Sequence, residues 1–272
     1  MQKLYVFLIL FITAGCTTIE INERDAFDNH KTVTPESFDI SALTLYDRTI
    51  ETEDNVSINA WFLLRDDAEA TVLYFGGNGF LMVKSRPLIE SYATIPVNLV
   101  LFDYRGYGLS GGDPSVEGIQ TDAQRMFEAV QELAGERSTP LFIHGHSMGS
   151  FLSGYIADRE NVAGYIFESP ISEVNSWTRN LVPWLLRPFI RFDIDSSIAS
   201  QNNLDRVSDI EHPLLIIGGS DDDITPFSMA EELLAASASD QKDLVKIEDG
   251  THNDLPEFEQ YRISLEDFLF QN

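Results

Sequence analysis

The chain has 272 residues, 43% of them hydrophobic, and its excess of Asp and Glu over Lys and Arg gives a formal net charge of −26 at pH 7. This length and composition are enough to bury a full core, and they fit one domain of roughly 230 residues after a short leader. The acid excess argues against a nucleic acid partner, because binding one depends on clustered Lys and Arg that neutralise phosphates.

The first twenty residues, MQKLYVFLILFITAGCTTIE, have the pattern of a bacterial lipoprotein signal. Lys3 precedes an apolar stretch over residues 4–12, and small residues lead to Cys16, the only cysteine of the chain. The apolar stretch is too short to span a bilayer comfortably. We therefore predict a signal peptide over 1–15 that is cleaved before a lipid-anchored Cys16; an uncleaved membrane anchor and an ordinary secretory leader are the alternatives.

Thr17, rather than Asp, follows the cysteine, so in bacteria with two membranes we expect this lipoprotein at the outer membrane, facing the periplasm. Residues 16–40 are polar and irregular in pattern, and we interpret them as a tether. The domain itself is expected over 41–272.

Strand patterns alternate with helix patterns through the rest of the chain. The strands are predicted at residues 71–76, 97–103, 140–145, 162–168, 213–218 and 243–248. Helical patterns fall between them, notably over 116–134 and 147–158, and a further helix is expected at the C-terminus. Several strands are near-continuous apolar runs, which is typical of parallel strands covered on both faces. The alternation predicts an α/β fold with a mostly parallel central sheet flanked by helices, and residues 41–52 and 56–65 are expected to form an antiparallel hairpin at its edge.

The stretch LFIHGHSMGSF, residues 141–151, places a serine between two glycines where a strand pattern passes into a helix pattern. A nucleophile on such a sharp turn needs small residues two positions before and two after it, and Gly145 and Gly149 meet that demand. Ser147 is therefore a candidate nucleophile. It needs a base and an orienting acid from elsewhere in the chain.

Of the five histidines, His252 is the best candidate base, because it lies in a loop between the last predicted strand and the C-terminal helix. Structural roles are expected for the others, His30, His144, His146 and His212. The acid is expected in GGSDDDITP, residues 218–226, where a buried strand ends before three aspartates. Ligands of parallel sheets bind at such strand ends. The cluster lacks the ligand pattern of an EF-hand, and we predict no metal.

Six motifs together resemble the α/β-hydrolase superfamily, and within it the serine hydrolases of the ABHD12, ABHD13 and ABHD17 group and their bacterial relatives. They are LYFGGNG (73–79), FDYRGYGLSGGDPS (102–115), HGHSMG (144–149), FESP (167–170), GGSDDDITP (218–226) and GTHND (250–254). The order of nucleophile, acid and base is the order of this fold.

The resemblance implies roles for individual residues. The family pattern puts the acid at Asp222, with Asp223 the alternative if the alignment is wrong by one residue. Ser147 would attack an acyl carbonyl, His252 would carry the proton, and the backbone N–H groups of Met148 and Asn78 would bind the oxyanion. The resemblance implies no cofactor.

A lid is expected over about residues 171–212, between the fourth and fifth of the predicted parallel strands. Trp177, Trp184 and Phe189 would line an acyl pocket or touch lipid; helix packing against the sheet is the alternative.

These observations predict a lipid-anchored serine esterase, lipase or thioesterase that acts on a small-molecule or lipid acyl ester. The alternatives are an amidase or peptidase on the same triad and a non-catalytic hydrolase-like binding protein of the cell envelope.

Overall fold

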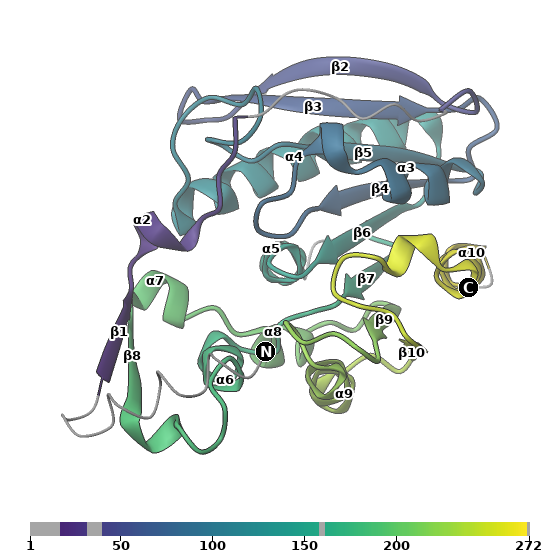
Figure 1. Cartoon of the computed structure of the whole chain (residues 1–272). Helices are drawn as coiled ribbons and strands as arrows, with labels where there is room; N and C mark the ends of the chain where they lie inside the picture. Colours follow the sequence, from purple (N-terminus) through teal and green to yellow (C-terminus); the bar gives the residue numbers. More distant parts are fainter. Residues whose placement is uncertain (1–16, 32–39, 158–160, 271–272) are drawn as a thin grey trace.

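The computed structural model describes residues 17–31, 40–157 and 161–270. Within these ranges the chain folds around an eight-stranded sheet in the order β10-β9-β7-β6-β4-β5-β3-β2 (Figure 1). Its strands are β2 (Thr44–Glu51), β3 (Ser57–Leu64), β4 (Ala70–Phe75), β5 (Val97–Phe102), β6 (Leu141–His146), β7 (Gly164–Glu168), β9 (Leu214–Gly219) and β10 (Lys242–Ile247).

The six strands from β5 to β10 in this order pair in parallel, and β3 and β2 add an antiparallel edge. The expected hairpin is therefore confirmed, and Asn55 in its turn takes a positive φ of 60°. Every residue of β4, β5, β6, β7 and β9 is buried, which accounts for their near-continuous apolar runs.

Helices cover both faces of the sheet, each over its own core. One face carries α3 (Arg86–Ala93) and α10 (Glu259–Phe270), which bury Tyr92 and Leu265 in one apolar cluster. The other face carries α4 (Val116–Arg137), α5 (Gly149–Tyr155), α8 (Asn203–Val207) and α9 (Phe227–Ala236), which contribute to a second cluster. The expected α/β layering is present, with α4 and α5 close to their predicted places.

Shorter elements follow β4, β7 and β10 along the chain. They are η2 (Met82–Lys84), α6 (Val174–Asn180), η3 (Arg187–Phe189), β8 (Ile190–Ile194), α7 (Ser196–Ala199) and η4 (Leu255–Glu257).

The N-terminal part departs from the expected tether. Thr17–Ile21 forms strand β1, which pairs in parallel with β8, and Glu23–Ala26 forms the short helix α2 (Figure 1). Phe27 is buried in the core cluster under α4 and α5. The prediction of an irregular tether is therefore wrong for residues 17–27, which form β1 and α2 and bury Phe27, and 32–39 lie outside the described residues. The local pattern could not show this, because the pairing partner of β1 lies about 170 residues away in the sequence.

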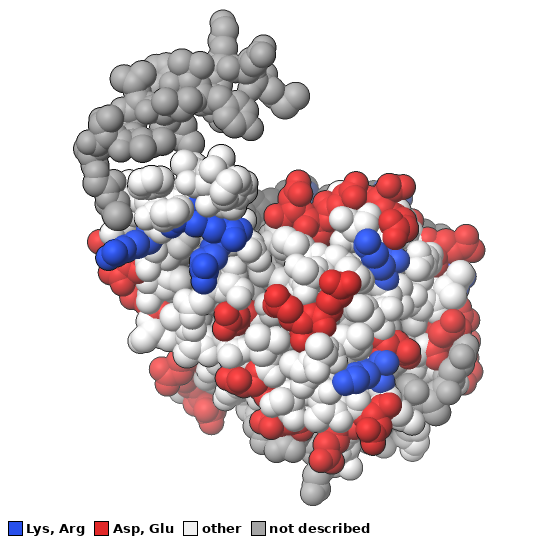
Figure 2. Space-filling view, turned by 90° about the horizontal axis from the view of Figure 1, so that it is seen from below, with Lys and Arg blue, Asp and Glu red and all other residues white. Residues whose placement is uncertain are grey.

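Acidic side chains are distributed over the face in Figure 2, with Lys and Arg in a few small groups among them. This distribution follows the net charge of −26, and it places the acid excess on the solvated surface.

Candidate active site

Ser147 lies on the turn between β6 and α5 and has a positive φ of 52°. Residues other than glycine rarely adopt this backbone conformation, so the surrounding structure must hold it in place. The Ser147 N–H donates to the carbonyl oxygen of Glu168 at the end of β7, at 2.9 Å, and the Ser147 carbonyl accepts from the Ser150 N–H at 3.0 Å. The strained turn is thus fixed from the sheet side and from the helix side.

The two glycines flanking Ser147 are required by close backbone approach. A Cβ atom on Gly149 would overlap the backbone of Phe75 in β4, and one on Gly145 would overlap the Ser153 side chain and the backbone of Gly149. This is the steric reason for the glycines two positions before and two positions after Ser147.

Ser147, His252 and Asp222 form a continuous chain of contacts. His252 Nε2 lies 3.0 Å from Ser147 Oγ, and His252 Nδ1 lies 2.9 Å from Asp222 Oδ2. All three side chains are at least nine-tenths buried, although they come from three separate loops. The structure thus brings together the three residues that the motifs singled out.

Asp222 differs from its two neighbours in burial and in partners. Asp221 and Asp223 are exposed, whereas Asp222 is 4% exposed. Its Oδ1 accepts from the N–H groups of Ile224 and Thr225, at 2.9 and 2.7 Å, and its Oδ2 accepts from Thr225 Oγ1 at 2.8 Å. Burial by itself raises the pKa of Asp222, but these donors together with His252 lower it, and the net direction is down.

His146 lies beside His252, as a residue of the pocket wall. The two rings are 4.9 Å apart between centroids, and His146 Nε2 is 2.9 Å from the His252 carbonyl oxygen. Burial lowers the pKa of His146, which favours its neutral form. An uncharged neighbour adds no fixed positive charge beside His252.

The side chain of Glu168 forms a buried polar network beneath the Ser147 turn. The sequence contained no indication of this network, apart from the place of Glu168 in the FESP motif. The Glu168 carboxylate accepts from Tyr261 O–H at 2.9 Å and lies 3.0 Å from His144 Nε2, and Tyr92 O–H is 2.7 Å from His144 Nδ1. Burial raises the pKa of Glu168, but His144, His146 and Tyr261 outweigh it and lower the pKa. The strand end that accepts from the Ser147 N–H is therefore held by a charged, fully buried carboxylate.

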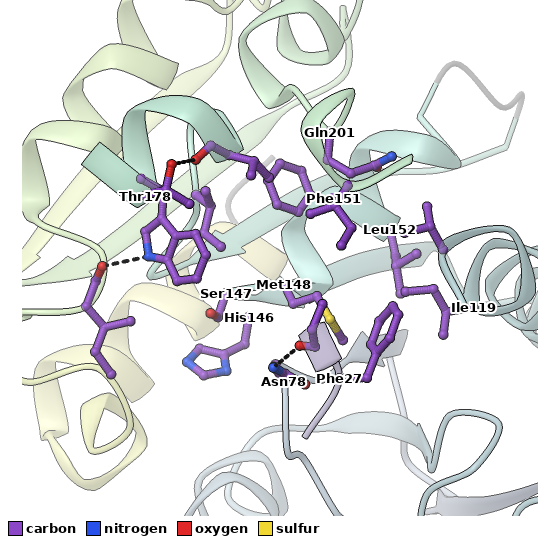
Figure 3. Close-up of a pocket in the computed structure, with 18 of the residues that line it drawn as sticks. Phe27, Asn78, Ile119, His146, Ser147, Met148, Phe151, Leu152, Thr178 and Gln201 are labelled. Atoms are coloured by element: carbon purple, nitrogen blue, oxygen red, sulfur yellow. Dashed lines mark hydrogen bonds between the residues drawn. The ribbon is translucent and has the colours of Figure 1, made fainter. Parts of the chain in front are cut away.

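A cavity of about 540 Å³ opens beside Ser147 (Figure 3). Its walls are mainly apolar, and Figure 3 shows Phe27, Ile119, Phe151 and Leu152 around it. None of the described residues that line it is Asp, Glu, Lys or Arg. The volume is within the usual range of small-molecule sites.

The two expected oxyanion donors, Met148 and Asn78, both line this cavity. Met148 follows Ser147 at the start of α5, and Asn78 follows β4. The two loops lie close together, since a Cβ atom on Gly77 would be 3.2 Å from Ser147 Cβ. Among the described residues, neither backbone N–H donates to a backbone acceptor.

Part of the expected lid contributes to the cavity. Trp177 of α6 lines it, and its indole Nε1–H donates to the Ile224 carbonyl at 3.0 Å. Trp184 and Phe189 do not line the cavity and are 73% and 45% exposed. The expectation of an acyl pocket residue thus fits Trp177 among the three aromatic residues.

Three further residues of the cavity wall were missed by sequence reasoning. Ile21, Ala26 and Phe27 come from the N-terminal part that was interpreted as a tether. Cys16 and the leader over 1–15 lie outside the described residues.

The described parts of the chain contain no group of three or more His, Cys, Asp and Glu side chains suited to a metal ion. No helix within these described parts has the length and apolar character needed to cross a membrane.

Comparison with known proteins gives matches over most of the chain. The sequence profile of the Hydrolase_4 family, described as serine aminopeptidase, S33, matches residues 66–201. The protein bem46 of Schizosaccharomyces pombe is 25% identical over 246 residues, which cover 88% of this chain and 80% of bem46.

Two solved structures share the fold. An esterase of Pyrococcus furiosus superposes with a TM-score of 0.72 at 22% identity, over 90% of this chain and 97% of the esterase. A monoglyceride lipase variant of Saccharomyces cerevisiae gives 0.64 at 15% identity, over 90% and 98%. The α/β-hydrolase fold expected from the motifs is confirmed.

Proposed function

The chain belongs to the Hydrolase_4 family of α/β hydrolases, and we propose that it is a serine hydrolase that cleaves carboxylic esters or thioesters with an apolar acyl group. The observation that carries this proposal is the hydrogen-bonded series Ser147, His252 and Asp222 beside an uncharged apolar cavity. Such an arrangement supplies an activated nucleophile and a place for the acyl chain of its substrate.

The proposed reaction has two halves. Ser147 Oγ attacks the acyl carbon while its proton passes to His252 Nε2, and Asp222 stabilises the resulting imidazolium. The carbonyl oxygen becomes an oxyanion, which the N–H groups of Met148 and Asn78 stabilise. The C–O or C–S bond to the leaving group then breaks, and His252 returns the proton to that group.

The acyl-enzyme is released by water. His252 takes a proton from the water as its oxygen attacks the acyl carbon, and then gives that proton to Ser147 Oγ as the acyl–serine bond breaks. The products are the carboxylic acid and an alcohol or thiol. No metal or organic cofactor is needed for any of these steps.

An aminopeptidase is the second candidate, because the family description names one. Such an enzyme must bind the free ammonium group of its substrate, and a buried charge without a partner is costly. The described cavity lining contains no carboxylate. The wall chemistry therefore favours an uncharged acyl group over an N-terminal amino acid.

We also propose that residues 1–15 are a lipoprotein signal and that Cys16 carries the lipid, with the outer membrane as the site of attachment. Because 17–31 pack against the domain, we place the start of the hydrolase unit near residue 17 rather than 41. Residues of about 171–212 form the lid of this unit, which supplies Trp177 to the cavity.

The proposed activity is tested by covalent labelling of Ser147 and by measuring ester hydrolysis. A fluorophosphonate probe should label Ser147, and Ser147→Ala should lower ester hydrolysis by about 10⁴-fold or more without altering the circular dichroism spectrum. Unchanged turnover in this variant would end the proposal. Faster cleavage of aminoacyl anilides than of aryl esters by the parent protein would favour the aminopeptidase.

A further inference from the structure

The stretch of residues 17–31, here called the N-terminal segment, forms one wall of the cavity beside Ser147. Ile21, Ala26 and Phe27 line that cavity. Phe27 is 9% exposed and belongs to the same apolar cluster as Ile119 and Leu152, which also line the cavity. Figure 3 shows the Phe27 ring beside Ile119, at the end of the drawn group away from Thr178. An apolar wall residue of this size offers a long acyl chain contact area that a short one does not use.

The same segment holds the side chain of Asn78. Asn78 Nδ2 donates to the Ala26 carbonyl at 2.9 Å, a bond drawn in Figure 3, and Asn78 Oδ1 accepts from the Asp28 N–H at 2.8 Å. Oδ1 also accepts from Tyr107 O–H at 2.9 Å. The Asn78 carboxamide is thus hydrogen-bonded to both chain neighbours of Phe27. The backbone N–H of Asn78 is the proposed oxyanion donor.

The segment is itself anchored on both sides of Phe27. Toward its start, the Glu23 carboxylate accepts from the Val116 N–H at the beginning of α4, at 2.6 Å, and the Glu23 N–H donates to Asp195 at 2.6 Å. Toward its end, the His30 carbonyl accepts from the Gly108 N–H at 2.7 Å. The Glu23 contact is favourable because a negative side chain is stabilised at a helix N-terminus. Together the three contacts tie the segment to α4, to the lid and to the loop after β5.

We propose that the N-terminal segment is a working part of the active site, in which Phe27 determines acyl-chain preference and the backbone of Ala26 and Asp28 positions Asn78 for oxyanion binding. The inference rests on the proposed serine-hydrolase function and deepens it. Phe27 acts as a specificity-determining residue. The hydrogen bonds of the Asn78 side chain to the segment fix the position of the Asn78 backbone N–H. The segment therefore acts on catalysis through Asn78.

The first experiment compares Phe27→Ala with the parent in the full chain, on p-nitrophenyl acetate and p-nitrophenyl decanoate. Loss of the ring removes contacts that only a long chain reaches, so kcat/KM should fall about 10-fold or more for the decanoate and less than about threefold for the acetate. Phe189→Ala is the matched control, since Phe189 is exposed and outside the cavity. It should leave the ratio of the two esters unchanged.

Global destabilisation would lower both activities of Phe27→Ala together, so an unchanged ratio between the esters would overturn the role of Phe27. If this variant does not fold, Phe27→Leu gives the same comparison with most of the volume retained, and a smaller shift of the same sign is expected.

The second experiment separates the backbone donor at position 28 from its side chain. Asp28→Pro removes the N–H that bonds to Asn78, whereas Asp28→Ala keeps it. Misplacement of an oxyanion donor should lower kcat for both esters by about 10-fold or more in Asp28→Pro, with KM little changed. Asp28→Ala loses the carboxylate but keeps the N–H, so its kcat should fall clearly less than that of Asp28→Pro. Asn78→Ala, which frees the loop entirely, should fall at least as far as Asp28→Pro. Equal kcat values in the proline and alanine variants would overturn the positioning role.

Fluorophosphonate labelling distinguishes a failure of the proposed serine-hydrolase function from a failure of the proposed role of the N-terminal segment. A parent protein that neither hydrolyses esters nor reacts at Ser147 contradicts the proposed function itself. In the other case the parent reacts, and Phe27→Ala and Asp28→Pro are labelled at the rate of the parent by both short-chain and long-chain fluorophosphonates. That result contradicts only the role of the N-terminal segment.

Discussion

At the scale of single residues, the three consecutive aspartates show how position decides chemistry. Asp221 and Asp223 are exposed to solvent, and Asp222 contacts His252 and accepts three hydrogen bonds from Ile224 and Thr225. These donors keep the carboxylate charged and fix its direction. Only Asp222 is therefore placed to orient the imidazole.

The aspartates can be separated by substitution. Asp222→Asn should lower kcat by about 10⁴-fold, because an amide in this place favours the wrong tautomer of His252. Asp221→Asn and Asp223→Asn should stay within a few fold of the parent, as measured by ester hydrolysis. A severe loss in Asp223→Asn instead would show that the assignment is wrong by one residue.

Asp103, the residue directly after β5, makes a pH-dependent contribution to stability. Burial raises its pKa to about 6, although the Met82 N–H donates to its Oδ1 at 2.8 Å. In the unfolded chain the pKa is about 3.9. The folded protein therefore binds the Asp103 proton more tightly, so its contribution to stability is complete below about pH 4 and is lost as the pH rises through about 6.

The expected size follows from this shift of about two pKa units, which corresponds to about 3 kcal/mol. The free energy of unfolding of the parent, relative to Asp103→Asn, should fall by about this amount between pH 4 and pH 7. Chemical denaturation of both proteins across this range measures it, and the shared effect of the net charge cancels in the difference. Parallel pH profiles would show that Asp103 titrates as an ordinary carboxyl group.

At the scale of elements, the contact between α5 and β4 fixes the Ser147 turn. Gly149 packs so closely on Phe75 that a Cβ atom there would overlap backbone atoms, which cannot move as a flexible side chain can. Gly135, near the end of α4, has no atom within 4 Å of a Cβ placed on it and is exposed. The chain thus offers two helical glycines with opposite surroundings.

Gly149→Ala should lower the free energy of unfolding by about 2 kcal/mol or more and reduce kcat, because α5 must shift away from β4 and carry Met148 with it. Gly135→Ala should raise stability by about 0.5 to 1 kcal/mol, since alanine loses less backbone entropy in a helix. Thermal or denaturant unfolding gives both values. A Gly149→Ala protein as stable and active as the parent would contradict the close contact.

At the scale of the whole molecule, the N-terminal segment links the cavity to the proposed lipid anchor. Thr17, the first residue of β1, directly follows Cys16, and Phe27 reaches the cavity wall ten residues later. Lipidation at Cys16 would therefore hold the hydrolase unit close to the membrane surface. Several acyl chains are needed for firm attachment, because one alone gives only marginal binding.

Cys16→Ser should block lipidation and signal processing, so that an unprocessed precursor accumulates in the expressing cells. Mass spectrometry of the N-terminus of the parent should find a lipid-modified Cys16 as the first residue, and membrane fractionation should place it with the outer membrane. An intact leader with an unmodified Cys16 in the parent would remove the lipoprotein assignment and leave the catalytic proposal as it stands.

The sequence by itself was enough to predict the fold class and to select Ser147 and His252, and the resemblance of its motifs to the α/β hydrolases selected Asp222 among the three aspartates. The fold class could be predicted because parallel strands covered on both faces have near-continuous apolar sequences. Ser147 could be selected because the tight turn after β6 demands glycines at fixed positions around the serine. Both constraints act over a few neighbouring residues, so they are visible in the printed order of the chain.

Only the tertiary structure showed how the N-terminal segment packs against the cavity and how the charged network behind Ser147 is arranged. The pairing of β1 with β8, the burial of Phe27 and the contact of Glu168 with Tyr261 join residues that are about 90 to 170 positions apart. Polar, short segments such as 17–31 carry no periodic pattern of their own, since their stability comes from partners elsewhere in the chain. Such long-range contacts are determined by the packing of the whole domain, which is why the tether interpretation failed. The motifs are local, so they could name Ser147, Asp222 and His252, whose side chains lie within hydrogen-bonding distance in the structure.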